Sequence, residues 1–259
     1  MLEAKKISLF IFAHQDDEFG VFHKIVDELL NRRRVYCVYL TDGVLKGCSS
    51  KVRNRESVSV LKKLGVFEND IYFVGDILSI SDGRLIGSLK AGYDWLKYKI
   101  IELNVDSEVA SIYTPAWEGG HPDHDAAHAI TVAVANKLDI TSHVHQFSLY
   151  NGYKCFGKFF NVMTIIPTNG PVVKSKLQWS SKFYFLYLCL NYPSQAKTWL
   201  GLFPFVVLKY LISGNQLLQS VSIERLQLKP HNGQLYYEAR GFIKWDEFSE
   251  KLRLWMNND

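Results

Sequence analysis

The sequence predicts an α/β fold: a Rossmann-like, open, mostly parallel twisted sheet flanked by helices, with a less regular C-terminal extension. Two observations support this prediction. Short apolar runs alternate with longer amphipathic stretches through the first half of the chain, which is typical of βαβ units around a parallel sheet. The chain has 259 residues, 47% of them hydrophobic and 22% charged, so it can bury a full core. This composition excludes a disordered or collagen-like protein.

The expected elements of the first half alternate between strand and helix. The apolar run 7–13 predicts a buried strand, and 18–32 has apolar side chains at helical spacing before a basic cluster that suits a helix C-terminus. Further strands are expected at 35–41, 71–74 and 109–113, and further helices at 51–64, 88–104 and 125–136. Right-handed crossovers between them give an open, doubly wound sheet.

The region from about residue 150 lacks this alternation and carries most of the prolines. It is expected to contain a helix at 183–190 and a terminal strand near 235–240. Because the sequence shows no repeat, low-complexity tract or linker, it predicts a single domain over 1–259. Residues 1–150 form its α/β core, and 151–259 form a C-terminal elaboration.

Charge, cysteine usage and hydropathy bear on partners and compartment. Thirty Lys and Arg against 26 Asp and Glu is too small an excess to indicate nucleic acid binding. Four well-separated cysteines without a CxxC pair favour reduced thiols in a cytoplasmic protein. The N-terminal apolar run ends at His14, which is too short for a signal-peptide core.

The most hydrophobic region, 183–213, is interrupted by polar residues and prolines, so no transmembrane segment is expected. We expect this region to form core or an interface between copies of the chain in a homo-oligomer. The alternative is peripheral contact with the inner face of a membrane, or a groove that accepts lipid.

Two clusters of metal-ligand residue types lie where ligands bind in such a sheet, beyond the carboxyl ends of the strands. The first, His14-Gln-Asp16-Asp17-Glu, follows the first expected strand. The second, His121-Pro-Asp-His124, precedes the helix expected at 125–136. The loop at 42–50, after the second strand, should converge with both.

A zinc site with an open position for water needs three imidazole or carboxylate ligands. His14, Asp17 and His124 could supply these ligands. The alternatives are that the carboxylates cap the following helix and that the second cluster is simply a polar loop. Capping accounts for one carboxylate and no histidine. Two such clusters at matching strand ends favour a metal site.

The sequence here resembles the zinc-dependent de-N-acetylases, the family that includes the PIG-L N-acetylglucosaminyl-phosphatidylinositol deacetylases and the bacterial LmbE-like sugar deacetylases. The resemblance covers about the first half of the chain. Relatives usually have proline where Gln15 stands. The residues that carry the resemblance are the two clusters above, Thr41-Asp42-Gly43, Arg53-Asn-Arg-Glu56 and, more weakly, Tyr192-Pro-Ser-Gln195.

The resemblance implies a role for each matching position. His14, Asp17 and His124 match the ligands of Zn²⁺, with Fe²⁺ or another divalent ion as alternatives. Two further matches are catalytic: Asp16 matches the general base, and His121 matches the residue that stabilises the oxyanion or protonates the leaving amine. Arg53 matches a substrate-binding arginine.

Asp42 has two readings that rest on its position after the second strand rather than on the resemblance. Its carboxylate could orient His121 or His14, since ligating histidines usually donate their other N–H to a carboxylate or carbonyl. The alternative is that it belongs only to an Asp-Gly turn.

The implied activity is metal-dependent removal of the N-acetyl group from a GlcNAc-type amino sugar of a glycoconjugate, with release of acetate. Residues 1–150 would bind the metal and 151–259 would shape a pocket for an amino-sugar small molecule, nucleotide sugar or glycolipid. The alternatives are hydrolysis of another N-acyl group, such as N-formyl, and a non-catalytic carbohydrate-binding relative. A nucleotide-binding Rossmann protein would need GxGxxG after the first strand, and the sequence has His14-Gln-Asp-Asp-Glu there.

Overall fold

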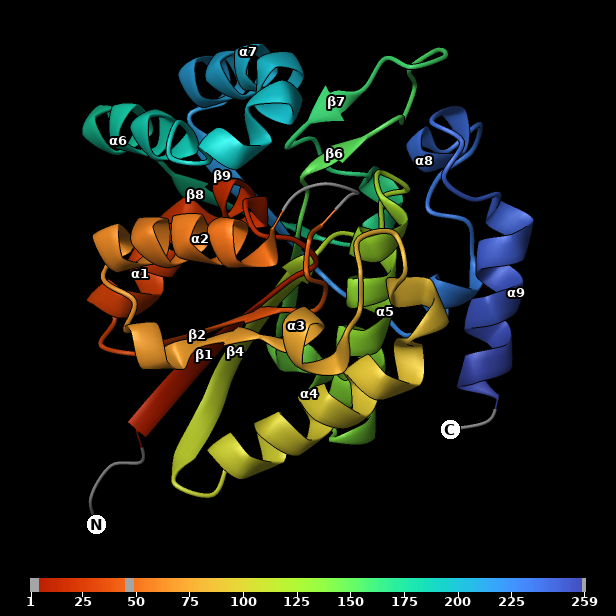
Figure 1. The fold of residues 1–259 in the computed structure, drawn as a ribbon, viewed down its shortest axis with the longest axis horizontal. Coiled ribbons are helices and arrows are strands. Elements are labelled where there is room, and N and C mark those ends of the chain that lie inside the picture. The colour runs from red at the N-terminus through yellow and green to blue at the C-terminus, as the bar shows by residue number, and fades with distance from the viewer. Residues whose placement is uncertain (1–4, 45–48, 258–259) are drawn as a thin grey trace.

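A computed structural model describes residues 5–44 and 49–257, and its main feature is a seven-stranded sheet of order β3-β2-β1-β4-β5-β9-β8 (Figure 1). The five strands from β3 to β5 run parallel, and β9 and β8 add an antiparallel edge. The predicted open, mostly parallel α/β sheet is therefore confirmed. The strands are β1 (Lys5–Phe12), β2 (Arg34–Tyr39), β3 (Ile71–Phe73), β4 (Ser107–Pro115), β5 (Val144–Phe147), β8 (Val172–Lys176) and β9 (Asn215–Ser220).

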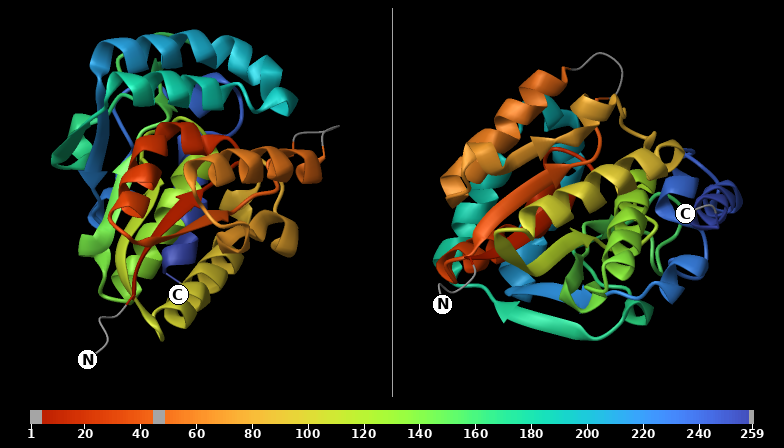
Figure 2. Two further views of the ribbon diagram at one scale, coloured as in Figure 1. Left: turned by 90° about the vertical axis from the view of Figure 1, so that its left-hand side faces the viewer. Right: turned by 90° about the horizontal axis from the view of Figure 1, so that it is seen from below.

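Helices cover both faces of this sheet (Figures 1 and 2). One hydrophobic cluster packs α1 (Phe22–Leu30), α2 (Ser50–Leu64), α6 (Trp179–Cys189) and α7 (Ala196–Ser213) against one face. A second cluster packs α4 (Leu89–Leu103), α5 (Pro122–Lys137) and α9 (Trp245–Met256) against the other. Successive side chains of a strand point to opposite faces, so β1 must be apolar at every position to serve both clusters. Its buried run 7–12 meets that requirement except at Ser8.

The elements expected in the first half are present close to their expected bounds, with one difference. The stretch 18–32 is divided into a 3-10 turn, η1 (Asp17–Gly20), and α1. Gly20 is the last residue of η1, and a Cβ there would lie 2.6 Å from the Leu149 side chain, which would have to move to accommodate a larger residue. The structure also adds β5 and the short helix α3 (Val74–Leu78).

Cys37, Cys155 and Cys189 are free thiols, and Cys48 lies outside the described residues.

The C-terminal half is more regular than expected. It supplies β8 and β9 to the main sheet, a two-stranded hairpin of β6 (Tyr150–Asn151) and β7 (Asn161–Val162), and the helices α7 and α9, in addition to the expected helix α6. The strand expected at 235–240 is wrong, because Tyr236–Ala239 forms the short helix α8. Glu238 holds this turn by accepting hydrogen bonds from the N–H groups of Leu235 (2.9 Å) and Trp245 (3.0 Å).

One segment, Pro193–Ser213, is long and apolar enough to cross a membrane by length and composition, with a hydropathy of 1.2. The expectation that no segment reaches this length is therefore not met. Only 22% of this window is buried. Length and composition alone do not distinguish a spanning helix from one that packs on a folded core, and α7 packs against the core through Trp199, Leu202, Val206 and Tyr210.

Candidate metal centre and catalytic pocket

The two histidine clusters meet at the carboxyl ends of β1 and β4. These strands are neighbours in the sheet, and the strand order reverses between them, which is where open α/β sheets bind ligands. His14 follows the end of β1. His121 precedes α5, and its Nδ1 accepts a hydrogen bond from the Asp123 N–H (3.2 Å). Pro122 at the start of the helix has no N–H that would need a partner there.

The three predicted metal ligands converge. His14 Nδ1 lies 3.2 Å from His124 Nε2, and the same His124 nitrogen lies 3.1 Å from Asp17 Oδ1. The other oxygen of Asp17 accepts hydrogen bonds from the N–H groups of Ala13 (3.0 Å) and His14 (2.8 Å). This arrangement fixes the carboxylate, with Oδ1 directed toward His124 and Oδ2 3.8 Å from His14 Nδ1.

These separations fit a tetrahedral zinc site. Zn²⁺ binds imidazole nitrogen and carboxylate oxygen at about 2.0–2.2 Å, so two tetrahedral ligand atoms lie roughly 3.3 Å apart. The observed 3.1 and 3.2 Å are close to this value. All three side chains are buried, and their ligand atoms lie within 4.8 Å of one another. The chemistry and spacing of the donors therefore fit a divalent cation with three protein ligands.

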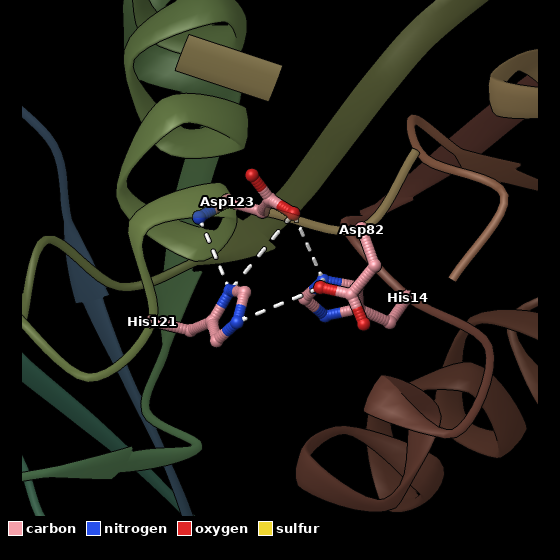
Figure 3. A group of neighbouring side chains, drawn as sticks. All are labelled: His14, Asp82, His121 and Asp123. Carbon is pink, nitrogen blue, oxygen red and sulfur yellow. Dashed lines mark hydrogen bonds and ion pairs between the residues drawn. The ribbon is translucent and has the colours of Figure 1, made fainter. Parts of the chain in front are cut away.

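Asp82, His121 and Asp123 lie around His14, and the two carboxylates contact its other ring nitrogen, Nε2 (Figure 3). His14 Nε2 lies 3.2 Å from Asp123 Oδ2 and 3.2 Å from Asp82 Oδ1. A carboxylate at Nε2 holds the proton on that nitrogen and leaves the Nδ1 lone pair free for a cation. Asp123 also accepts hydrogen bonds from the N–H groups of Gly83 (2.5 Å) and Leu85 (3.0 Å), so it fixes the loop that carries Asp82.

Sequence reasoning gave no role to Asp82 or Asp123. Asp123 lies inside the motif His121-Pro-Asp-His124, so this motif could have identified it as a site residue. Asp82 stands in the loop after α3, 41 positions from Asp123, and no local pattern marks it. The hydrogen bonds of Asp123 to that loop bring it to His14.

The buried histidines and carboxylates of this centre shift one another's pKa values. Burial works to lower the pKa of His14, but the charge of Asp82 and hydrogen bonds to Asp123, Asp17 and Asp82 raise it well above its ordinary value. Burial works to raise the pKa of Asp17, but His124 and His14 hold it well below its usual range. Asp17 is therefore ionised at neutral pH, as a metal ligand must be.

Asp16 lies beside the ligands and lines the pocket. Its backbone φ is 107°, an unusual value for a residue other than glycine, and this turn separates its side chain from that of Asp17. Asp16 Oδ1 lies 3.1 Å from Arg53 Nη2. Burial raises the pKa of Asp16 to about 7, with Arg53 opposing this shift and Asp17 and Glu18 adding to it.

Arg53 also lines the pocket, but it is buried and bonded mainly to the protein. In addition to Asp16, its guanidinium donates to the carbonyl oxygens of Gly43 and Gln15, at the ends of two neighbouring strands. It therefore fixes the two loops and the Asp16 carboxylate. Contact with a substrate, as expected from the sequence, stays a prediction.

His121 also borders the pocket. Since its Nδ1 accepts a hydrogen bond, the neutral ring carries its proton on Nε2, which lies 3.6 Å from Asp82 Oδ1. Burial, and then the nearby His14, lower the pKa of His121 to about 4. At neutral pH the ring is therefore uncharged and acts as an N–H donor.

Of the two alternatives for Asp42, the contacts in the structure fit the turn. Asp42 Oδ1 accepts hydrogen bonds from the N–H groups of Val44 (2.8 Å) and Asp82 (3.2 Å). Its carboxylate closes the turn after β2 and holds the Asp82 loop, so it influences the centre only through that loop. The loop at 42–50 does reach the site through Gly43, while its residues 45–48 lie outside the described part of the chain.

The cavity beside these residues has a volume of about 460 Å³. One wall is the candidate centre, and the C-terminal half supplies most of the rest. Glu118, which sequence reasoning missed, accepts hydrogen bonds from the N–H groups of Leu149 (2.7 Å) and Tyr150 (3.0 Å) and so places Tyr150 beside His124. The lining residues of the C-terminal half are Tyr150, Phe160, Gln195, Lys197, Thr198, Gly201, Leu202, Tyr236, Arg240 and Phe242.

The fold and the site define an α/β protein with a candidate divalent-metal centre at its topological switch point. Residues 9–135 match the model of the family described as PIG-L: GlcNAc-PI de-N-acetylase. The chain is also 28% identical over 166 residues to a Schizosaccharomyces pombe protein named as a probable N-acetylglucosaminyl-phosphatidylinositol de-N-acetylase. That match covers 62% of each chain, so this chain spans less than two thirds of the curated relative. The resemblance is confirmed as a match of residues 9–135 to the PIG-L family model.

Solved structures share the fold. The A40926 pseudoaglycone deacetylase Dbv21 superposes with a TM-score of 0.62 at 15% identity, covering 88% of this chain and 99% of that one. The N,N'-diacetylchitobiose deacetylase from Pyrococcus horikoshii gives a TM-score of 0.58 at 15% identity, covering 89% and 88%. The zinc-inhibited form of the teicoplanin deacetylase Orf2 gives 0.54 at 14% identity, covering 74% and 85%.

Proposed function

We propose that this protein is a metal-dependent hydrolase that removes the N-acetyl group from an N-acetylated amino sugar and releases acetate. The observation that carries the proposal is the convergence of His14, Asp17 and His124 within ligand distance of one another, beside a pocket that also exposes Asp16 and His121. Zn²⁺ is the proposed ion, and Fe²⁺ or another divalent cation is the alternative.

His14, Asp17 and His124 would hold the cation, which when bound polarises an amide carbonyl and lowers the pKa of water to about 7. Asp16 takes the proton of the attacking water. The His121 Nε2–H donates a hydrogen bond to the oxyanion that forms on the former carbonyl oxygen. As the C–N bond breaks, Asp16 returns the proton to the leaving nitrogen, and the products are acetate and a free amine.

The cavity and the relatives support an amino-sugar substrate. A volume of about 460 Å³ falls in the range of small-molecule sites and holds a sugar ring with part of its substituent. Tyr150, Tyr236 and Phe242 offer aromatic faces for packing. Two of the related proteins are named as deacetylases of N-acetylated sugar compounds, N-acetylglucosaminyl-phosphatidylinositol and N,N'-diacetylchitobiose. The proposed substrates are a small amino-sugar compound, a nucleotide sugar or a glycolipid.

Acyl release from a panel of compounds tests the proposal. The zinc-loaded protein would be incubated with N-acetylated nucleotide sugars, lipid-linked sugars and small glycosides, and with their N-formyl counterparts. We expect acetate and the free amine from at least one class. Formate alone would support hydrolysis of another acyl group instead. Binding without release of any acyl group would contradict the proposal and favour a non-catalytic carbohydrate-binding protein.

A further inference from the structure

The charges of the chain are unevenly distributed. Residues 140–223 contain seven lysines and no Asp, Glu or Arg. Subtracting these seven charges from the formal net charge of +4 leaves −3 for the rest of the chain. This basic segment includes the β6–β7 hairpin, α6 and α7. Such a charge asymmetry indicates an anionic partner for this part of the molecule.

The loop between β6 and β7 exposes phenylalanines between lysines. It reads Gly-Tyr-Lys-Cys-Phe-Gly-Lys-Phe-Phe. Phe156 is 89% exposed and Phe159 is 76% exposed, and the neighbouring Lys154 and Lys158 are exposed as well. Two phenylalanine side chains left in water at a loop tip contribute nothing to the core, so their burial is available to a partner.

The outer side of α7 continues this surface. Trp199, Leu202, Val206 and Tyr210 face the core. At about 100° per residue, the exposed apolar side chains of the helix fall on the opposite side. These side chains are Leu200, Phe205, Leu208 and Ile212, with exposures of 82%, 45%, 54% and 80%. A helix that is apolar all round and only partly covered by protein needs a second apolar environment.

The helix and the hairpin lie side by side (Figure 1). The rings of Phe205 on α7 and Phe160 at the end of the hairpin loop are 5.2 Å apart. Phe160 also lines the catalytic pocket, together with Lys197, Thr198 and Gly201 of α7. The hairpin loop and α7 are therefore in contact beside the pocket. We refer to their exposed apolar residues as the outer surface: Phe156, Phe159, Leu200, Phe205, Leu208 and Ile212.

We propose that this outer surface docks the protein on an anionic lipid bilayer. The exposed phenylalanines and leucines enter the interface between headgroups and acyl chains, and the exposed Lys154, Lys158 and Lys197 attract the anionic headgroups. This docking places the mouth of the pocket at the lipid surface. The proposal does not depend on the reaction that the pocket catalyses.

The inner contacts of α7 make this a peripheral mode of binding. The Trp199 ring lies 5.3 Å from that of Phe19, and the Tyr210 hydroxyl donates to the Phe19 carbonyl (2.8 Å), so the helix is held flat against the core. A second copy of the chain fits the outer surface less well than a bilayer does. A symmetric contact would bring the lysines of one basic segment onto those of the other.

Co-sedimentation of the full-length protein with lipid vesicles tests the proposal. We expect binding to vesicles of phosphatidylcholine mixed with phosphatidylglycerol, weaker binding to phosphatidylcholine alone, and loss of binding as salt is raised. The double variant Phe156→Ser/Phe159→Ser should weaken binding by at least about tenfold. Lys154→Glu/Lys158→Glu should weaken binding to the anionic vesicles while leaving acyl release from a water-soluble substrate unchanged.

Matched controls separate this surface from a general effect. Phe67→Ser removes a phenylalanine that is 68% exposed in the turn after α2, and Lys137→Glu/Lys244→Glu makes the same charge change at the end of α5 and just before α9. Both should bind as the wild type does. Failure of the wild type to bind anionic vesicles would overturn the proposal, as would equal losses in the loop variants and their controls. A wild-type dimer that the phenylalanine variant dissociates, without vesicle binding, would overturn it in favour of self-association.

Discussion

The chemistry of His14 depends on two carboxylates that no sequence pattern paired with it. The positions of His14, Asp16, Asp17, His121 and His124 were predictable because each lies in a motif next to a strand end or helix start. Asp82 was not predictable, because its approach to the site depends on the contacts of a distant loop with Asp123 and Asp42. The sequence thus indicated the three proposed metal ligands, but it did not indicate the carboxylates that orient His14.

Replacing Asp82 tests the orienting role. In Asp82→Asn the charged partner of His14 Nε2 is lost, and we expect divalent-metal affinity to fall by about 10- to 100-fold. Isothermal titration with Zn²⁺ measures this loss. Asp76→Asn, which changes an exposed carboxylate on α3, serves as the control. Equal affinities of both variants and the wild type would contradict the role assigned to Asp82.

Replacing Asp16 separates catalysis from metal binding. Asn keeps the shape of the side chain but cannot accept the proton of water. We therefore expect Asp16→Asn to lower kcat by about 10²- to 10⁴-fold at unchanged metal content. Steady-state acetate release and metal analysis of the same preparation provide the two readouts. Wild-type turnover in this variant would remove Asp16 as the base.

Helices and strands whose apolar residues follow a clear pattern were predicted well, and those without such a pattern were missed. β1 and α2 have patterns typical of a buried strand and of a helix that ends at a glycine. In contrast, α7 is apolar around its whole circumference, so it shows no helical periodicity to recognise. The pairing of β9 with β5 and β8 is non-local, and no local signal in the chain specifies it.

The turn between β4 and α5 depends on a close backbone approach. A Cβ at Gly120 would lie 1.9 Å from the Tyr150 carbonyl oxygen, so one of the two segments must move to accommodate alanine. We expect Gly120→Ala to lower the free energy of unfolding by about 1–3 kcal/mol and to reduce activity. Urea denaturation measures the first effect. Gly87→Ala, whose Cβ would meet no atom within 4 Å, is the control, and an equal loss there would contradict this packing argument.

The hydrogen bonds by which Glu28 attaches α1 to the sheet make the stability of the protein sensitive to acid. Glu28 is buried and accepts hydrogen bonds from Ser8 (2.5 Å) and Tyr113 (2.8 Å). Burial works to raise its pKa, but these bonds and Lys24 lower it below the ordinary value of 4.5. A carboxyl group with a depressed folded-state pKa contributes stability above its unfolded pKa, and this contribution is lost as the pH falls through the folded pKa.

We therefore expect Glu28→Gln to cost about 1–3 kcal/mol at neutral pH and to flatten the loss of stability below about pH 4.5. Thermal unfolding followed from neutral pH down to about pH 3 measures both effects. The exposed Glu250→Gln should follow the wild type. Parallel pH profiles for Glu28→Gln and the wild type would show that this carboxylate does not couple α1 to the sheet.

In the whole molecule, the parallel half supplies the candidate metal centre, and the C-terminal half supplies most of the pocket wall and the outer surface. This division agrees with the extent of the family match, which ends at residue 135. The treatment of 1–259 as a single domain, a cytoplasmic location and a homo-oligomeric state stay predictions.

His14, Asp17 and His124 are proposed to hold one divalent cation, and metal analysis of the purified protein after zinc loading and desalting tests this ligand set. We expect about one zinc per chain in the wild type and in His23→Ala, which changes a histidine on α1, and almost none in Asp17→Ala or His124→Ala. Full zinc content in both ligand variants, with folding confirmed by circular dichroism, would contradict it.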